Sequence, residues 1–372
     1  MSPAVLALTL AVARSEPAPP PPEADPAPEA GAARAALAAL EEEDVALAHQ
    51  ALGPFEPLDR AGAAVRFAGG VLRFFEGRYP EAVALLASAG ATETPEYGMA
   101  QAALRVTLRD QRVETEHFAV WFPPDAAPAV PPLLGALDAQ RRALRPLLGE
   151  LPAGRLRVEL VGKPGEVAAL AGLAEQDVVR SGAVGAAKFG KLVLLAPEGP
   201  PGDAWLDAAA HELTHTVITA RTRNRAPVWL QEGLATWLEG SWRGRGGALS
   251  PRAEALVARA GARGRLMELR EMHPSLARLS FDRAALAQAE AALAVEYLSR
   301  RAGAASIAEL LERVGAGADA EEVAAGELGL GPGGFAAGWR RYLDERALSQ
   351  AGRETLRRLG EVDGADGPRG TP

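Results

Sequence analysis

Cysteine is absent from this chain, and its absence excludes two kinds of site. None of the 372 residues is cysteine, so the chain forms neither a disulfide framework nor a zinc site with thiolate ligands. Aromatic residues make up only 5% of the chain, and there are only five histidines. Because histidine is so scarce, two histidines at a regular spacing are informative.

Long apolar runs and a strong charge of one sign are also missing. The apolar run at the amino terminus is too short to span a bilayer, and no other stretch is apolar and long enough to cross a membrane. The formal net charge of −8 is mild for this length and provides no basic field for nucleic acid. The chain is 48% hydrophobic and 24% charged, as in globular proteins. We therefore expect no transmembrane segment, no nucleic-acid partner, and room for a helical module and a catalytic domain.

The amino terminus carries the chain's short apolar run. Residues 4–13 read AVLALTLAVA and end in a small-x-small triplet, like the apolar part of a secretory signal peptide cleaved after Ala13. The leading residues 1–3 contain no Lys or Arg, which leaves an ordinary start of a cytoplasmic protein open. We expect residues 1–13 to be a signal peptide and the protein to be periplasmic or extracellular. Residues 14–31 are rich in proline and predict a linker.

Residues 32–110 predict a small all-α module. Two helical patterns are joined by a Gly-Arg-Tyr-Pro turn, and Gly70 stands twelve residues before Ala82, where small residues let helices approach closely. This pattern resembles one tetratricopeptide repeat. A single repeat cannot bury its own face, so neighbouring parts of the chain must complete its core. The module could dock a protein partner, but the single repeat favours a structural cap.

The most specific pattern in the chain is HELTH at residues 211–215. His211 and His215 are one helical turn apart, so both imidazoles leave the same face and can bind one ion. Glu232, in the run VWLQEGLATWLEG, is available as a third ligand from a second helix. Three protein ligands leave one position for water, as in a catalytic zinc site. The alternative is a solvated surface helix, but the apolar residues around the motif favour burial.

The pair HELTH and WLQEGLA resembles the gluzincin metallopeptidases. It is closer still to the bacterial peptidase-MA-like group, whose members are often attached to tetratricopeptide repeats. The resemblance implies an α+β fold with a zincin-like metallopeptidase domain over 113–350, one Zn²⁺ ion and a peptide or protein substrate. The remaining residues, 351–372, are then the end of the carboxyl-terminal helix and a disordered tail.

Three alternating segments predict strands in the peptidase domain: Glu114–Phe122, Arg155–Val161 and Lys191–Leu195. In the family, the strand that spans 188–195 here is the sheet edge that holds an extended substrate. Aminopeptidase relatives carry an acidic motif in this region to grip the substrate's free amine. This chain has GAAKFG there, with Lys188 and no carboxylate. The departure favours an endopeptidase, and Lys188 itself is expected to be solvated.

The ligand set also implies residue roles. Glu212 follows the first histidine and is expected to act as general base. Relatives often place a carboxylate one turn after the third ligand, where this chain has Thr236; Asp207, one turn before His211, is another candidate for orienting a ligand. Tyr297 is the candidate for assisting the oxyanion, although a packed core position explains it better. Two alternatives stay open: an envelope binding or assembly factor with little hydrolysis, and a zinc hydrolase of other substrates.

Overall fold

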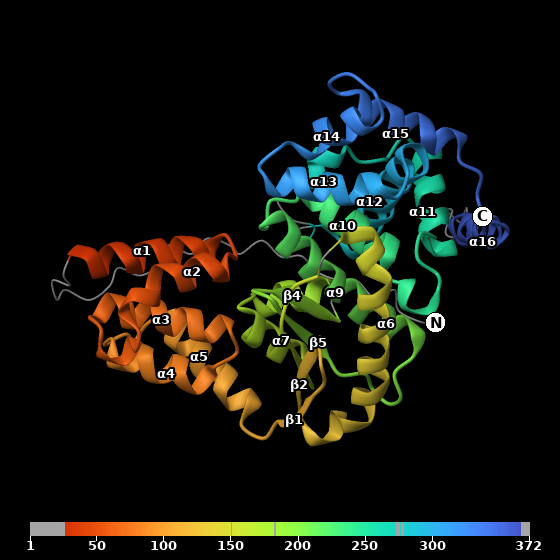
Figure 1. The fold of residues 1–372 in the computed structure, drawn as a ribbon. Coiled ribbons are helices and arrows are strands. Elements are labelled where there is room, and N and C mark those ends of the chain that lie inside the picture. The colour runs from red at the N-terminus through yellow and green to blue at the C-terminus, as the bar shows by residue number, and fades with distance from the viewer. Residues whose placement is uncertain (1–26, 150, 182–183, 273–275, 277–278, 366–372) are drawn as a thin grey trace, which may run out of the picture.

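The computed structural model describes residues 27–149, 151–181, 184–272, 276 and 279–365. The predicted signal peptide and residues 14–26 of the predicted linker lie outside the described residues. Within the described residues, no helix combines the length and apolar character that crossing a bilayer requires. The chain folds into a helical module, a five-stranded sheet and a larger set of carboxyl-terminal helices (Figure 1).

The amino-terminal module consists of five α-helices with short connections. They are α1 (Ala27–Glu41), α2 (Val45–Leu52), α3 (Ala63–Phe75), α4 (Tyr79–Ser88) and α5 (Pro95–Thr107), with two short 3-10 helices, η1 (Gly53–Phe55) and η2 (Leu58–Arg60). Helix α1 begins at Ala27, inside the linker predicted to end at 31, because a proline in the first turn of a helix is tolerated. Gly70 lets α3 meet α4: a Cβ there would lie 2.6 Å from Leu86 Cγ. The assignment to the tetratricopeptide repeat stays a prediction.

The sheet is mixed, with order β1-β2-β3-β5-β4. Its strands are β1 (Gln111–Glu114), β2 (Phe118–Phe122), β3 (Leu156–Val161), β4 (Gly185–Lys188) and β5 (Lys191–Leu195). The central strands β2, β3 and β5 are parallel, and β1 and β4 add antiparallel strands at the two edges. Two predictions need correction. The segment 114–122 is not one strand: Glu114 ends β1, and only residues 118–122 form β2. The segment 188–195 is not the sheet edge: Lys188 ends β4, and residues 191–195 form β5, which lies between β3 and β4, so the edge strand is β4.

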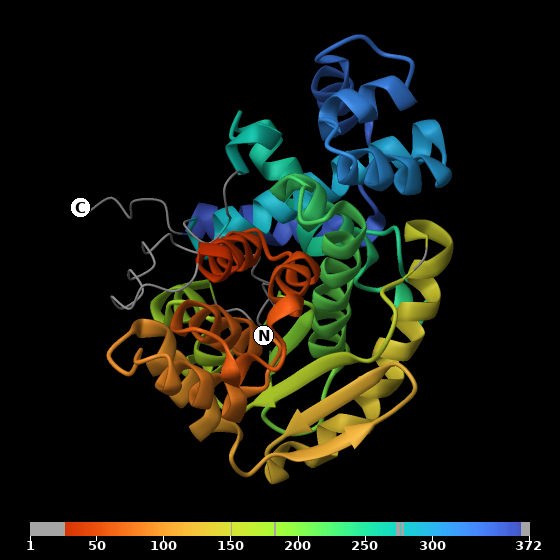
Figure 2. The same ribbon diagram turned by 60° about the vertical axis from the view of Figure 1, so that its left-hand side comes forward.

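Helices cover both faces of the sheet. On one face, α6 (Val130–Leu148) and α9 (Asp203–Thr222) share a core with β2, β3 and β5 that includes Leu133, Leu160 and Leu213. On the other face, the module and α7 (Pro164–Ala171) share a core with Val161 and Val193. The sheet therefore completes the module's hydrophobic core, and the module lies beside the sheet in both views (Figure 2).

Buried polar contacts also join the module to the sheet. Tyr79 of α4 donates to Glu159 Oε2 of β3 at 2.7 Å, and Lys191 Nζ of β5 donates to the Tyr79 hydroxyl at 2.9 Å. Lys188 is only 4% exposed, and its Nζ lies 3.0 Å from Glu43 Oε1 of the module. The expectation of a solvated Lys188 is therefore wrong, because the module covers the strand end that carries it.

The carboxyl-terminal part is helical. It contains α10 (Val228–Leu238), α11 (Pro251–Ala262), α12 (Phe281–Ala302), α13 (Ala305–Gly315), α14 (Ala320–Glu327), α15 (Gly334–Glu345) and α16 (Gln350–Ala365). The shorter elements of the domain are α8 (Glu175–Ser181), η3 (Pro124–Ala129), η4 (Ser241–Arg243) and η5 (Leu269–Met272). Helix α16 continues to Ala365, so most of the predicted end segment is helix, and residues 366–372 lie outside the described residues. Helices α10 and α12 pack closely together and position the candidate site.

Candidate metal centre

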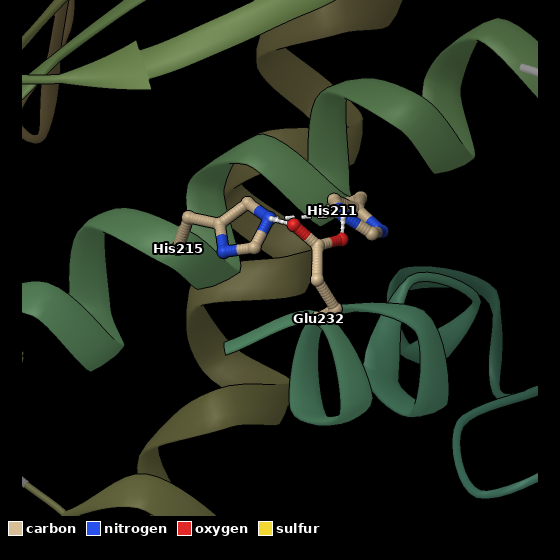
Figure 3. Close-up of side chains that lie close together, drawn as sticks. All are labelled: His211, His215 and Glu232. Carbon is tan, nitrogen blue, oxygen red and sulfur yellow. Dashed lines mark hydrogen bonds and ion pairs between the residues drawn. The ribbon is translucent and has the colours of Figure 1, made fainter. Parts of the chain in front are cut away.

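Two neighbouring helices bring three metal-binding side chains together. Helix α9 carries His211 and His215 on the face that packs against α10, and Glu232 lies in the first half of α10 (Figure 3). The two imidazole Nε2 atoms are 3.0 Å apart, and Glu232 oxygens lie 3.6 Å from His211 Nε2 and 3.9 Å from His215 Nε2. All three side chains are buried, with 0–3% of each residue exposed. One donor atom from each lies within 4.8 Å of the others.

This donor set fits a zinc ion. Tetrahedral zinc with bonds of about 2.0–2.1 Å requires its ligand atoms to be roughly 3.3 Å apart. The observed separations of 3.0, 3.6 and 3.9 Å lie on both sides of that value. Two imidazole nitrogens and one carboxylate oxygen are donors that zinc accepts readily, and a fourth position stays available. The three residues can therefore hold one ion after small side-chain adjustments.

The two histidines differ in their proton affinity without a metal. Burial lowers the pKa of His211, but the carboxylates of Glu232 and Glu239 outweigh burial and raise this pKa to about 10. Burial is also the largest effect on His215, and together with the neighbouring His211 charge it lowers the His215 pKa to about 4. At neutral pH the proton therefore resides on His211, where it balances the charge of Glu232.

Each of the three donors is held by a further polar residue. His211 Nδ1 lies 3.3 Å from Glu239 Oε2, and His215 Nδ1 lies 3.2 Å from Gln231 Oε1. Gln288 Nε2 of α12 donates to Glu232 Oε2 at 2.8 Å. Contacts at both Nδ1 atoms leave the Nε2 atoms facing each other and Glu232, which is the tautomer and orientation that a shared ion requires.

A glycine next to Glu232 permits the contact with α12. A Cβ on Gly233 would lie 2.6 Å from the carbonyl oxygen of Ala291 and 3.0 Å from Val295 Cγ2. Any larger residue would therefore force α10 away from α12. Since Gln288 reaches Glu232 from α12, the close approach at Gly233 also sets the position of the third donor.

Glu212 lies between the histidine face of α9 and the edge strand. Consecutive residues of an α-helix are turned by about 100°, so Glu212 leaves α9 to one side of His211. It is 1% exposed, and a Cβ on Gly185 of β4 would lie 3.3 Å from Glu212 Cγ. The carboxylate-bearing side chain is therefore adjacent to the edge strand β4.

Within the described residues, the side chains of Asp207, Thr236 and Tyr297 form no hydrogen bond with the three metal-binding side chains. Asp207 accepts hydrogen bonds from Trp242 Nε1 at 2.8 Å and Arg243 Nε at 2.9 Å, so it anchors η4 to α9 instead of orienting a histidine. The Thr236 hydroxyl is buried and has no partner among the described residues. Tyr297 packs against Phe335, with ring centroids 5.8 Å apart, in the carboxyl-terminal core.

Sequence reasoning missed the three residues that hold the donors. Glu239 stands seven residues after Glu232, which is nearly two helical turns, so a signal for it existed in the helical period. Gln288 lies 56 residues from its partner, and only the packing of α12 on α10 reveals it. Gln231 precedes the third donor directly and, on sequence alone, gave no reason to be chosen.

Part of the chain matches a known protein superfamily. Residues 200–345 match the Peptidase MA superfamily, and this stretch contains His211, Glu212, His215 and Glu232. The resemblance of this region to peptidase-MA-like proteins is therefore confirmed, and the expected mixed α and β fold is confirmed by the five-stranded sheet and its helices. The match reaches neither the sheet nor the helical module. No curated protein matches the chain.

Two solved structures are similar to part of the chain. One is a mutant M1 zinc metallopeptidase from Deinococcus radiodurans, and the other is a mutant two-domain M1 zinc metallopeptidase bound to L-arginine. Each is 18% identical, with a TM-score of 0.38, and the alignment covers 65% of this chain and 53% of the other chain. The chain thus spans about half the length of these proteins.

Proposed function

We propose that this protein is a zinc-dependent metallopeptidase that hydrolyses peptide bonds in peptide or protein substrates. His211, His215 and Glu232 hold one Zn²⁺ ion, and Glu212 is the general base. The observation that carries the proposal is the convergence of the three buried donors from α9 and α10, whose ligand atoms lie within 4.8 Å of one another. The match of residues 200–345 to the Peptidase MA superfamily supports it.

The chain's own residues supply proton transfer and positioning. A zinc ion, when bound, acts as a Lewis acid that makes a coordinated water more acidic and polarises a substrate carbonyl. Glu212 accepts the proton of the attacking water and passes it to the departing amine. Its burial strengthens the electrostatic interactions that favour this transfer. Glu239, Gln231 and Gln288 keep the three donors oriented while charge develops at the centre.

The edge strand is proposed to hold the substrate. Among the strands of the described residues, β4 pairs with β5 alone, so its other edge can pair with an extended peptide. Gly185 at the start of β4 lies beside Glu212, which brings a peptide on this edge close to the base. No residue of β4 is acidic, and Lys188 is paired with Glu43. These features support endopeptidase action, because the strand offers no carboxylate to grip a free amine.

Two variants test the proposed roles. Glu212→Gln is expected to bind zinc like the parent and to lose at least about 100-fold in turnover, because the base is removed and the donors remain. His215→Ala is expected to lose both zinc and turnover. Metal analysis and a casein or peptide-library assay, before and after chelation, provide the measurements. A Glu212→Gln variant that cleaves like the parent contradicts the role of Glu212, and product ends that come only from single-residue trimming contradict endopeptidase action.

The burial of the centre supports a second candidate function. His211, Glu212, His215 and Glu232 are all at most 3% exposed. A binding or assembly factor of the cell envelope, which keeps the zincin fold with little hydrolysis, is consistent with such a closed centre. Tight zinc binding without any cleavage of casein or library peptides favours this candidate. Export itself is proposed from residues 1–13 alone.

A further inference from the structure

A cleft of about 850 Å³ separates the helical module from the peptidase region. One wall is α9, through Leu213, Thr216, Val217 and Ala220, and the opposite wall is the beginning of α2 together with Glu76. The turn between β4 and β5, residues 187–190, and the segment 151–155 close the remaining sides. None of the three metal-binding side chains lines the cleft, so it is a space distinct from the centre described above.

The cleft is nevertheless close to the proposed base. Leu213 follows Glu212 directly, and Thr216 follows His215, so the wall of the cleft and the metal centre share the same two turns of α9. Along β4, Gly185 contacts Glu212 and Ala187 lines the cleft. Two strand residues span about 7 Å. A peptide paired with β4 beside Glu212 therefore enters the cleft within two or three of its own residues.

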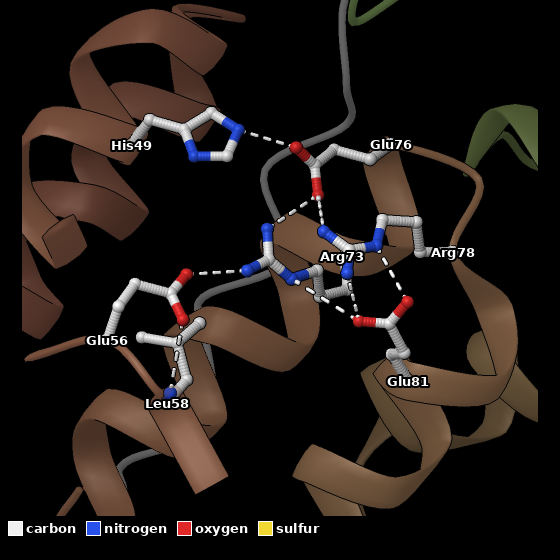
Figure 4. A network of polar contacts seen from close by, with 7 residues as sticks. All are labelled: His49, Glu56, Leu58, Arg73, Glu76, Arg78 and Glu81. Atoms are coloured by element: carbon white, nitrogen blue, oxygen red, sulfur yellow. Dashed lines mark hydrogen bonds and ion pairs between the residues drawn. The ribbon is translucent and has the colours of Figure 1, made fainter.

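On the module side of the cleft, Glu76 and Glu43 are paired with basic groups, and Asp44 caps a helix. Glu76 Oε1 lies 2.5 Å from His49 Nε2, and Arg73 donates to Glu76 Oε2 at 2.9 Å (Figure 4). Glu43 is paired with Lys188 across the two walls. Asp44 caps α2 by accepting from the Leu47 amide at 2.8 Å.

Three arginines line the cleft on the side of the peptidase region, and two of them have no partner for their side chains among the described residues. Arg155 is 3.3 Å from Glu114, and it donates to the Thr115 carbonyl at 2.8 Å. In contrast, the guanidinium groups of Arg141 in α6 and Arg223 at the end of α9, both of which line the cleft, have no hydrogen bond or ion pair with any residue that the structure describes. These two guanidinium groups outnumber Asp44, whose carboxylate has no ion pair with a described residue, so the net charge that the cleft offers a ligand is positive.

Arg223 is distinguished from the arginine that follows it in the loop after α9. Arg225 donates to the carbonyl of Gly315 at 2.6 Å and is used within the fold. Asn224 donates to the carbonyl of Glu42 at 3.1 Å, which ties the loop to the module and fixes it beside the cleft. Arg223 is exposed, occupies the left-handed C-cap of α9 with φ 51°, and lines the cleft.

We propose that this cleft binds a carboxylate-bearing segment of a polypeptide, with Arg141 and Arg223 pairing with its carboxylates. Charge complementarity selects an anionic segment, and the apolar wall of Leu213, Val217 and Ala220 accommodates peptide carbon atoms. The identification of that polypeptide as the substrate rests on the proposed function. The selectivity for carboxylates rests on the cleft alone.

Isothermal titration calorimetry tests the proposal by measuring the affinity of the chain for three peptides that differ in their carboxylates. The first alternates alanine and glutamate with both ends blocked, the second replaces glutamate by glutamine, and the third is the glutamine peptide with a free carboxyl terminus. The full chain carrying Glu212→Gln serves as the host, so that peptides stay intact. We expect the glutamate peptide to bind at least about tenfold more tightly than the blocked glutamine peptide, with a preference that weakens as salt rises. Tighter binding of the third peptide identifies the chain end as a further source of the carboxylate.

The host with Arg141→Gln and Arg223→Asn added is expected to lose at least about tenfold in affinity for the glutamate peptide and less than twofold for the blocked glutamine peptide. Asparagine is chosen at 223 because it tolerates the left-handed conformation. The matched control is Arg142→Gln with Arg252→Gln, which removes the same charge from exposed positions that do not line the cleft. This control is expected to bind like the host.

Four outcomes overturn the proposal: no binding of any peptide, equal binding of all three, unchanged binding by the double arginine variant, or tighter binding of a single-stranded oligonucleotide than of the glutamate peptide. The failure of the proposed function looks different. In that case the glutamate peptide binds with the expected arginine dependence, but the parent chain cleaves neither it nor casein.

Discussion

Every donor in the metal centre touches a polar neighbour from another turn or another helix. Glu239 is the neighbour with the largest electrostatic effect, because it brings a second carboxylate to His211. It lies three residues after Thr236, the position at which we expected such a partner from the sequence. The orientation of His211 is therefore set from the end of α10, at a side chain that is about one-third exposed.

Removing the Glu239 charge is expected to weaken zinc binding more than it affects the fold. The variant Glu239→Gln should bind zinc about 10–100-fold less tightly, because a carboxylate hydrogen-bonded to a ligand imidazole raises its basicity. Competition with a chromogenic chelator measures the affinity. The control is Glu309→Gln, an exposed carboxylate on α13. An unchanged zinc affinity in Glu239→Gln would remove Glu239 from the site.

Zinc binding is also expected to release a proton. The pKa of His211 is raised to about 10 without metal, because Glu232 and Glu239 outweigh the effect of burial. The imidazole is therefore protonated at pH 7, and a metal that takes the Nε2 lone pair must displace this proton. Zinc affinity then rises with pH between 6 and 8, and calorimetry at pH 7 in buffers of different ionisation heats should show release of about one proton per zinc. Zero release contradicts this protonation state.

For single residues, the sequence predicts the three metal-binding side chains but not the polar residues that hydrogen-bond to them. His211 and His215 are one turn apart in the chain, so the helical period alone brings them together. Glu232 could be chosen because an acidic residue in the following helix is available as a third ligand. Gln288 could not be chosen, because its contact with Glu232 depends on how α12 packs against α10.

Some helices and strands of the fold could be predicted from the sequence, and others could not. A helix around residues 211–215 was predicted from the spacing of His211 and His215, and α9 is that helix. Strand β1 was missed because all four of its residues are exposed and show no alternation. Strand β4 was missed because its residues, GAAK, are mostly small and have low strand propensity. It forms because β5 offers a partner, which is a tertiary effect.

The contact between α10 and α12 is the packing feature most sensitive to mutation. Gly233→Ala is expected to destabilise the protein by about 1–3 kcal/mol, because the added Cβ would lie 2.6 Å from a backbone oxygen of α12. The same variant should bind zinc less tightly, since Glu232 is the adjacent residue. Urea unfolding and zinc competition measure the two effects.

A second glycine provides the control for this prediction. Gly98, inside α5, has no other atom within 4 Å of an added Cβ. Gly98→Ala should therefore stabilise the protein by about 0.5–1 kcal/mol through helix propensity. If both variants change the free energy of unfolding in the same direction and by similar amounts, the close approach of α10 and α12 at Gly233 does not determine the effect of an added Cβ there.

For the whole molecule, the buried contacts between the helical module and the sheet, here called the joint, could not be predicted from the sequence. The sequence indicated that the module needs a neighbour to bury its face, and the sheet is that neighbour. It did not indicate that Lys188 and Lys191 would be buried there, with 4% and 1% exposed. A buried lysine depends on partners from distant segments, here Glu43 and Tyr79, and no local pattern marks such a residue.

The Tyr79 hydroxyl is expected to stabilise this joint. Tyr79→Phe removes a group that donates to Glu159 and accepts from Lys191, so the free energy of unfolding should fall by about 1–3 kcal/mol. The control is Tyr97→Phe, where the lost hydroxyl contacts only partly buried Gln101. Its effect should stay below about 0.5 kcal/mol. Equal effects of the two variants, measured by urea unfolding, would show that the buried contacts do not stabilise the joint.

The most direct test of the metal centre is an anomalous difference map, recorded at the zinc absorption edge from crystals grown with one equivalent of zinc. We predict a single strong peak per chain, about 2.0–2.2 Å from the Nε2 atoms of His211 and His215 and from a carboxylate oxygen of Glu232. A map without a peak between these side chains, or with Glu232 turned away from the ion, would contradict the proposed centre and the hydrolytic function built on it.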